Sequence, residues 1–143
     1  MTRLTLSAAQ AIIAGTIAEA RGRNAVPLGI IVLDNGGHPL AFAREDGATF
    51  FRFDVARAKA TGALGLGANT RALAERAATN PNLLLSISGA IDGRVVLSPG
   101  GVLILDGDTV IGAVGASGDT GDCDEACVLA GLRAAGFNLE SAG

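Results

Sequence analysis

Two residue types that often do chemistry occur only once each in this chain of 143 residues. The single histidine, His38, follows Gly37, and it fits either an exposed turn residue or a general base or haem ligand. The single lysine, Lys59, lies among small, apolar residues. It is therefore either a buried cation for an anionic ligand or a lysine whose stem packs on a helix while its amine reaches water. A single histidine excludes a multi-histidine zinc site within one subunit.

The segment AFAREDGA places Arg44 and Asp46 next to a predicted strand. Arg44 can hold a carboxylate with two parallel hydrogen bonds, or it can simply pair with Asp46 or another neighbouring acid. For proton transfer we consider Asp46, Lys59 and Glu125, because a lysine in apolar surroundings can have a shifted pKa.

The segment GASGDTGDCDE offers Ser117, Gly118 and backbone N–H groups at the start of a predicted helix. Such a start can bind anions. The carboxylates that follow, however, would repel a phosphate, and the P-loop pattern is absent. The acids can instead cap the helix, bind a cation or supply one carboxylate for acid/base work. Cys123 and Cys127 share a helix face, where they are a soft-metal or redox pair or simply two small packed residues.

Composition limits the protein's class. Hydrophobic residues make up 49% of the chain and the net charge is −3, which predicts one folded domain over residues 1–143. Without a basic cluster, we expect no nucleic-acid partner. No apolar run has the roughly 20 residues of a membrane span, and the start does not resemble a signal peptide, so we expect a cytoplasmic protein. The many uncharged residues favour contacts between subunits, hence a homo-oligomer.

Hydrophobic periodicity and turn residues predict a helix, two strands, two helices, three strands and a final helix. The first helix is expected to start at Ser7 and end before Gly22, and the second to start near Asp54. The residues 83–88 are predicted to form a loop and 92–98 a strand. The last helix is predicted over about 122–135, capped by Asp122. Because the strands come as hairpins, we expect an antiparallel sheet covered by helices, an α+β fold.

Several segments together resemble those of a known family. They are VLDNGGHPLAFAREDGA, ARAKATGAL, NPNLL, DGRVVLSPGGVLI, GDTVIGAVGASG and DEACVLAGL. With these, the chain resembles the GlcG/HbpS-like family, also called the haem-degrading or DUF336 domain, which includes the C-terminal domain of PduO proteins. The resemblance implies a profilin-like fold with a five-stranded sheet. It also implies dimers and higher oligomers, octamers among them.

The resemblance further implies a small ligand, because some members bind haem and others are tied to corrinoid metabolism. The positions it carries over are Arg44, Asp46, Lys59, Gly100, Gly101, Ser117, Gly118, Asp124 and Glu125. The chain departs from the family at Glu45, where members usually carry Met or another apolar residue. Haem ligation would have to use His38, a cysteine or a weaker ligand, since the chain has no Tyr.

Three functions are consistent with these residues and with the resemblance. The first is binding of haem, another tetrapyrrole or a small carboxylate, with Arg44 and Lys59 holding carboxylates, His38 beside them and the glycines allowing close backbone approach. The second is an enzyme of small-molecule catabolism, an isomerase, lyase or hydrolase that acts on a small carboxylate by acid/base chemistry. The third is an assembly or sensor subunit without chemistry.

Overall fold

A computed structural model describes residues 3–139 and contains a four-stranded antiparallel sheet. The strands are β1 (Gly29–Asp34), β2 (Pro39–Arg44), β3 (Gly101–Asp106) and β4 (Thr109–Ser117), in the spatial order β2-β1-β4-β3. Both hairpins predicted from the turn residues are present, β1–β2 and β3–β4. The predicted α+β class with an antiparallel sheet is therefore confirmed.

The strand predicted over residues 92–98 is wrong, so the sheet has four strands in the described part of the chain rather than five. Asp92 and Gly93 both have left-handed backbone angles, with φ of 55° and 70°. After this turn Val95 is buried against helix α2, where its Cγ2 fills the space that a Cβ on Gly62 would need. The apolar residues after Asp92 therefore pack on a helix instead of pairing with a strand.

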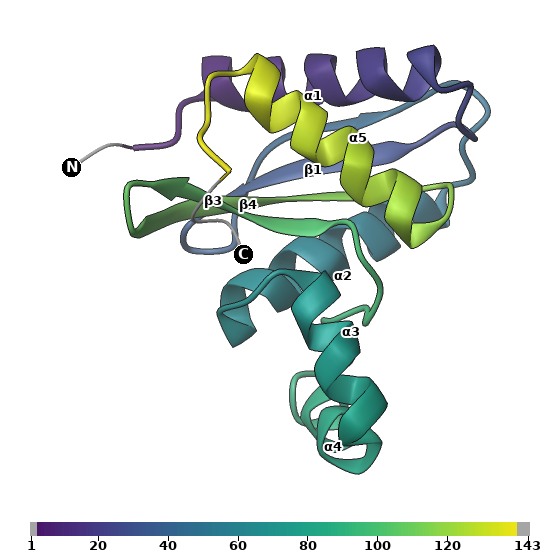
Figure 1. Cartoon of the computed structure of the whole chain (residues 1–143), viewed down its shortest axis with the longest axis vertical. Coiled ribbons are helices and arrows are strands. Elements are labelled where there is room, and N and C mark those ends of the chain that lie inside the picture. The colour runs from purple at the N-terminus through teal and green to yellow at the C-terminus, as the bar shows by residue number, and fades with distance from the viewer. Residues whose placement is uncertain (1–2, 140–143) are drawn as a thin grey trace.

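Helices cover both faces of the sheet (Figure 1). The helices are α1 (Leu6–Gly22), α2 (Phe51–Leu66), α3 (Thr70–Thr79), α4 (Pro81–Ala90) and α5 (Gly121–Ala134). α1 and α5 pack together on one face, and α2 packs on β1, β3 and β4 from the other. A Cβ on Gly15 of α1 would lie 2.9 Å from the Cα of Gly131 in α5, so these two glycines let the helices approach closely. No helix in the described residues is long and apolar enough to cross a membrane.

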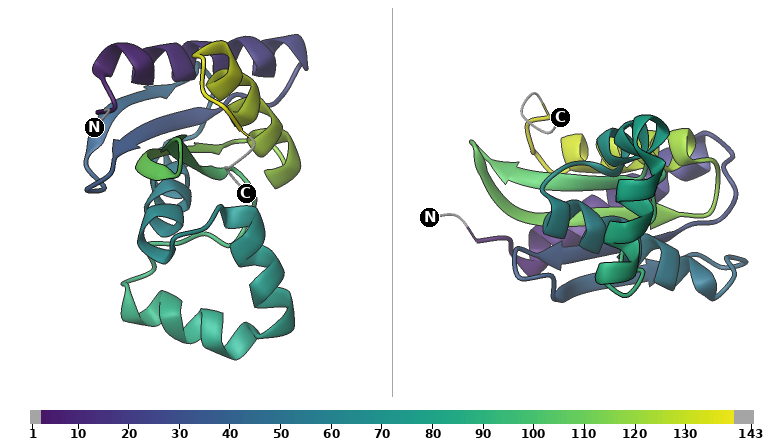
Figure 2. Two further views of the ribbon diagram at one scale, coloured as in Figure 1. Left: turned by 60° about the vertical axis from the view of Figure 1, so that its left-hand side comes forward. Right: turned by 90° about the horizontal axis from the view of Figure 1, so that it is seen from below.

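The loop predicted over residues 83–88 is also wrong, because these residues belong to α4. Pro81 occupies the first turn of this helix, where its fixed φ is favourable and its missing N–H costs nothing. α3 and α4 extend away from the sheet as an arm (Figure 2). Within α4 only Leu84 is buried, while Leu83 and Leu85 are exposed.

Three predicted helix caps are wrong. Thr5, rather than Ser7, caps α1, and its hydroxyl accepts a hydrogen bond from the Ala8 N–H. The start of α2 lies at Phe51, so Asp54 is inside its first turn. Thr120, rather than Asp122, caps α5 by accepting from the Cys123 N–H.

Predicted helix ends fare unevenly. Gly22 is the last residue of α1 instead of the residue after it. Gly136 does follow α5 in a left-handed conformation, with φ of 90°, and the Phe137 N–H then bonds to the Leu132 carbonyl. This is the glycine cap expected from the sequence.

Candidate functional site

A buried ion pair joins the middle of α2 to the first turn of α5. The Lys59 Nζ lies 3.1 Å from Asp124 Oδ2 and donates a second hydrogen bond, of 3.0 Å, to the Ala116 carbonyl at the end of β4. The side chains of Lys59 and Asp124 are only 4% and 1% exposed. Lys59 is thus the buried cation of the two sequence alternatives, and a carboxylate of the chain itself occupies it.

Burial shifts the pKa of both partners toward the neutral form. It lowers the pKa of Lys59 and raises the pKa of Asp124, and in each case the opposite charge of the partner resists the shift. The second oxygen of Asp124 accepts a hydrogen bond from the Asp119 N–H, which also favours the carboxylate. Shifted pKa values in two paired charged groups are typical of functional sites, but this pair is enclosed.

Three of the predicted ligand-binding residues surround this pair. A Cβ on Gly100 would lie 2.9 Å from Lys59 Nζ, and a Cβ on Gly101 would collide with the Lys59 carbonyl oxygen. Ser117 is buried, and its hydroxyl accepts a 2.8 Å hydrogen bond from Arg52 Nη1. That Lys59, Gly100, Gly101 and Ser117 bind a ligand stays a prediction. The sequence reasoning missed Arg52, whose spacing from Ser117 gives no signal.

The loop before α5 uses its polar groups internally. Gly118 lies against the Pro27 carbonyl and Leu28, where a side chain would not fit. The Asp119 carboxylate accepts hydrogen bonds from the N–H groups of Val26 and Thr120, which lower its pKa. The acids do not cap α5, whose cap is Thr120, and Asp119 instead ties the loop to Val26.

Arg44 and Asp46 line an open groove of about 440 Å³ together with Arg21, Pro27 and Glu45. The Glu45 carboxylate pairs with Arg21 at 2.9 Å and accepts a hydrogen bond from the Leu28 N–H. In residues 3–139, by contrast, the exposed Arg44 guanidinium has no hydrogen bond or ion pair. Arg44 is therefore available to an anionic ligand in this groove.

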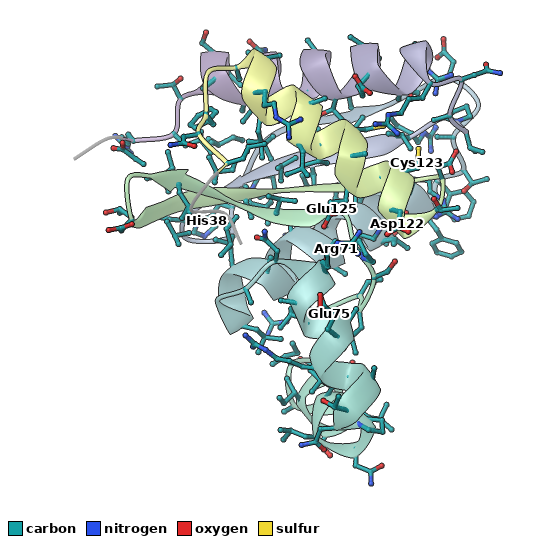
Figure 3. All side chains as sticks on the ribbon, in the orientation of Figure 1. His38, Arg71, Glu75, Asp122, Cys123 and Glu125 are labelled. Carbon is teal, nitrogen blue, oxygen red and sulfur yellow. The ribbon has the colours of Figure 1, made fainter. Side chains whose placement is uncertain are left out.

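The three predicted acid/base residues do not share a cavity within the described residues. Asp46 lies in the open groove, Lys59 is buried, and Glu125 forms a 2.9 Å ion pair with Arg71 on the surface. Arg71 also pairs with Asp122 at 2.6 Å, and so ties α3 to the start of α5. Figure 3 shows Arg71, Asp122 and Glu125 clustered there, well away from His38.

His38 lies on the β1–β2 turn with its side chain 80% exposed. Its Nδ1 is 3.4 Å from Oδ1 of Asp34, and the backbone N–H groups of His38 and Gly36 donate to the same oxygen. These hydrogen bonds lower the pKa of Asp34. A carboxylate beside Nδ1 leaves Nε2 as the nitrogen free to bind a ligand.

A second groove, of about 390 Å³, begins at this turn. It runs between the turn, α2 and the Gly93–Arg94 segment, and its lining comprises Gly36, Gly37, Phe53, Asp54, Arg57, Ala58, Thr61, Gly93 and Arg94. The Arg57 guanidinium lies 5.8 Å from the centre of the Phe53 ring. Phe53 and Arg57 were missed by the sequence reasoning, because the helix was expected to start near Asp54; with the observed start at Phe51, their spacing of four residues puts them on a shared face.

Neither cysteine forms a disulfide. Cys127 is fully buried, and burial raises the pKa of its thiol to about 12. No group of three or more His, Cys, Asp or Glu residues within 3–139 could hold a metal ion. Packing is therefore the role that the contacts of Cys127 support.

A family model described as "Haem degrading protein HbpS-like" matches residues 4–133. The chain belongs to this HbpS-like family. No curated protein matches it.

The solved structures that are more than 25% identical to this HbpS-like chain include ORFY and HbpS. Klebsiella pneumoniae protein ORFY is 29% identical, with a TM-score of 0.85 over 94% of this chain and 92% of ORFY. A double mutant of Streptomyces reticuli HbpS is 28% identical, with a TM-score of 0.79 over 93% of this chain and 87% of HbpS. A PduOC structure, solved as a haem complex, is 20% identical with a TM-score of 0.87 over 96% and 98% of the two chains. This last likeness shows the fold alone.

The donor set of this HbpS-like chain fits haem at the turn groove. His38 offers an imidazole whose other nitrogen faces a carboxylate, as iron-binding histidines commonly have. The groove beside it offers an aromatic ring and two guanidinium groups, which suit an apolar ring system carrying carboxylates. Within the described part of the chain, the groove that Arg44 and Asp46 line contains no His, Cys, Met or Tyr side chain that could ligate haem iron.

Proposed function

We propose that this HbpS-like chain is a homo-oligomeric small-ligand-binding protein whose ligand is haem or another tetrapyrrole. The observation that carries the proposal is the turn groove, which begins at Gly36 and Gly37, next to His38 in the chain, and is also lined by Phe53 and two arginines. The family's description supports the same ligand class.

Each residue of the groove has a distinct task in this proposal. The Nε2 of His38 binds the iron, and Asp34 holds the imidazole in the tautomer that leaves Nε2 free. Phe53 packs against the macrocycle, and Arg57 and Arg94 bind its carboxylates. Bound iron would supply ligand-exchange and redox chemistry at this groove.

A titration of the protein with haemin, followed at the Soret band, tests the proposal. We expect a saturable spectral shift for the wild type and its loss in His38→Ala. Asp34→Ala should weaken binding about tenfold, because it removes the partner that orients the imidazole. Asp108→Ala, in the other hairpin turn, is the control and should bind like the wild type. A wild type without a saturable shift, or a His38→Ala variant with an unchanged one, would refute haem binding at this groove.

A second candidate is the small carboxylate considered from the sequence, either as a ligand or as a substrate. The unpaired Arg44 favours it, because its guanidinium could hold a carboxylate in the groove. Asp46 in the same groove could then act on the molecule held there. Calorimetry with a panel of small carboxylates would detect it as binding that disappears in Arg44→Ala and persists in Arg76→Ala. The roles of Lys59 and Glu125 in such chemistry stay predictions, since ion pairs occupy both groups.

A further inference from the structure

The two edges of the sheet differ in how their backbone groups are satisfied. At the β3 edge, the first residues of the α3 segment take the place of a neighbouring strand. The Thr70 hydroxyl accepts a 2.9 Å hydrogen bond from the Gly101 N–H, and Asn69 Oδ1 accepts a 2.8 Å bond from the Leu103 N–H. The beginning of this edge is therefore closed to another chain.

The β2 edge has no such cover in the described residues. Ala43 lies opposite Ile30, and the Glu45 N–H donates to the Leu28 carbonyl, so alternate residues of β2 turn their backbone groups toward β1. The residues that alternate with them, Phe42 and Arg44, consequently turn their N–H and C=O groups outward. Leu40 does not continue this alternation, because the β1–β2 register shifts between Val32 and Leu33 and Leu40 packs against the same core as Ala41. An uncovered edge of this kind can accept another strand.

Exposed aromatic side chains accompany this edge. Phe42 is 38% exposed and stacks edge-to-face on Phe53 at 4.8 Å, while Phe50 and Phe51 are 68% and 63% exposed. α2 packs over β1, β3 and β4, which leaves the β2 side of this face largely uncovered. Three phenylalanines in this state expose on the order of 300 Å², taking roughly 200 Å² for a whole side chain. That is more than a third of the ~800 Å² that each partner buries in a standard interface.

We propose that two copies of this chain pair through β2, antiparallel across a two-fold axis, to form one continuous sheet. The register that uses both outward residues places Phe42 opposite the partner's Arg44 on each side of the axis. Each of these pairs exchanges both backbone hydrogen bonds.

A second copy fits this edge for reasons of both symmetry and charge. A two-fold interface must be complementary to itself, and a strand whose outward groups fall on two alternate residues, one on each side of Ala43, meets that condition. Arg44 is the only charged residue of β2, and in this register it faces an apolar residue instead of another arginine. Pro39 begins the strand, where its missing N–H removes no bond of the new ladder.

Light scattering after size-exclusion chromatography tests this interface, which rests on the homo-oligomer of the proposed function but not on its ligand. We expect a wild-type mass that is a multiple of the 14.2 kDa protomer. Phe42→Lys and Phe42→Pro should each reduce that mass to half or less, because the first places charge on the pairing edge and the second removes an outward N–H. Leu85→Lys, on the exposed face of α4, is the matched control and should keep the wild-type mass.

Three outcomes would overturn the interface: a monomeric wild type, edge variants of unchanged mass, or dissociation by Leu85→Lys alone, which would place the contact on the arm. Hydrogen exchange on the wild type decides the matter if an edge variant does not fold. The amides of Phe42 and Arg44 should gain protection as concentration rises, whereas the amide of Leu103 should be protected throughout. Edge amides that exchange equally fast at every concentration contradict the proposal. Haemin binding, measured separately, shows whether the ligand proposal fails with it.

Discussion

At the scale of single residues, the one lysine and the one histidine of the chain, Lys59 and His38, each have a carboxylate partner, Asp124 and Asp34 respectively. Neither partner could be predicted as such, because Asp124 is far away in the chain and Asp34 belongs to an ordinary turn. The two side chains differ in burial, because Lys59 is enclosed and His38 is exposed.

The buried pair should act mainly through stability. Asp124→Ala leaves the Lys59 ammonium buried without its partner, and we expect a loss of about 3–5 kcal/mol in the free energy of unfolding. Lys59→Met should also destabilise the protein, and the double variant should lose less than the sum of the single changes. Urea unfolding of the four proteins measures this coupling. Strictly additive losses would show that the two charges do not interact.

At the scale of elements, periodicity located the strands and most helices, but their ends depended on contacts that no local pattern shows. Thr5 and Thr120 cap helices at positions where Ser7 and Asp122 looked equally suitable. Asp122 instead pairs with Arg71, a contact made by the fold. The apolar run in α4 could not be distinguished from a strand or a packed loop, because its length suits both.

Glycines on the sheet set how closely α2 approaches. A Cβ on Gly115 of β4 would collide with the Ala56 carbonyl of α2. Gly115→Ala should therefore cost about 1–3 kcal/mol, since the helix backbone must move. Gly65→Ala is the matched control: nothing lies within 4 Å of its missing Cβ, so the change should stabilise α2 by about 0.4–1 kcal/mol. Equal effects in thermal unfolding would contradict this account of the close approach.

The Asp119 carboxylate should make stability depend on pH. Its pKa in the folded protein is below 3.8, the ordinary value for an aspartate, because the carboxylate accepts hydrogen bonds from the Val26 and Thr120 N–H groups. Its contribution is therefore present above pH 3.8 and is lost as the pH falls through the lower, folded-state pKa. We expect Asp119→Ala to have a lower Tm than the wild type at neutral pH, with the gap narrowing in acid. A gap that stays constant across this range, or one shared by Asp108→Ala, would count against it.

At the scale of the whole molecule, the hairpin order predicted the α+β class and the antiparallel sheet, and the family model confirms the resemblance seen in the glycine-rich segments. What could not be predicted is which groups share a surface. The turn groove brings Phe53 and Arg57 of α2 together with Arg94 from a segment that was expected to be a strand. The open β2 edge likewise becomes visible only once Thr70 and Asn69 are seen to close the other edge.

The position of iron in the protein crystallised with haemin tests the central claim most directly. The anomalous scattering of iron locates the metal independently of how the macrocycle is built. We predict an iron peak within bonding distance of His38 Nε2, with the macrocycle against Phe53 and its carboxylates toward Arg57 and Arg94. Iron bound away from the β1–β2 turn, or a complex in which His38 contacts no metal, would contradict the account.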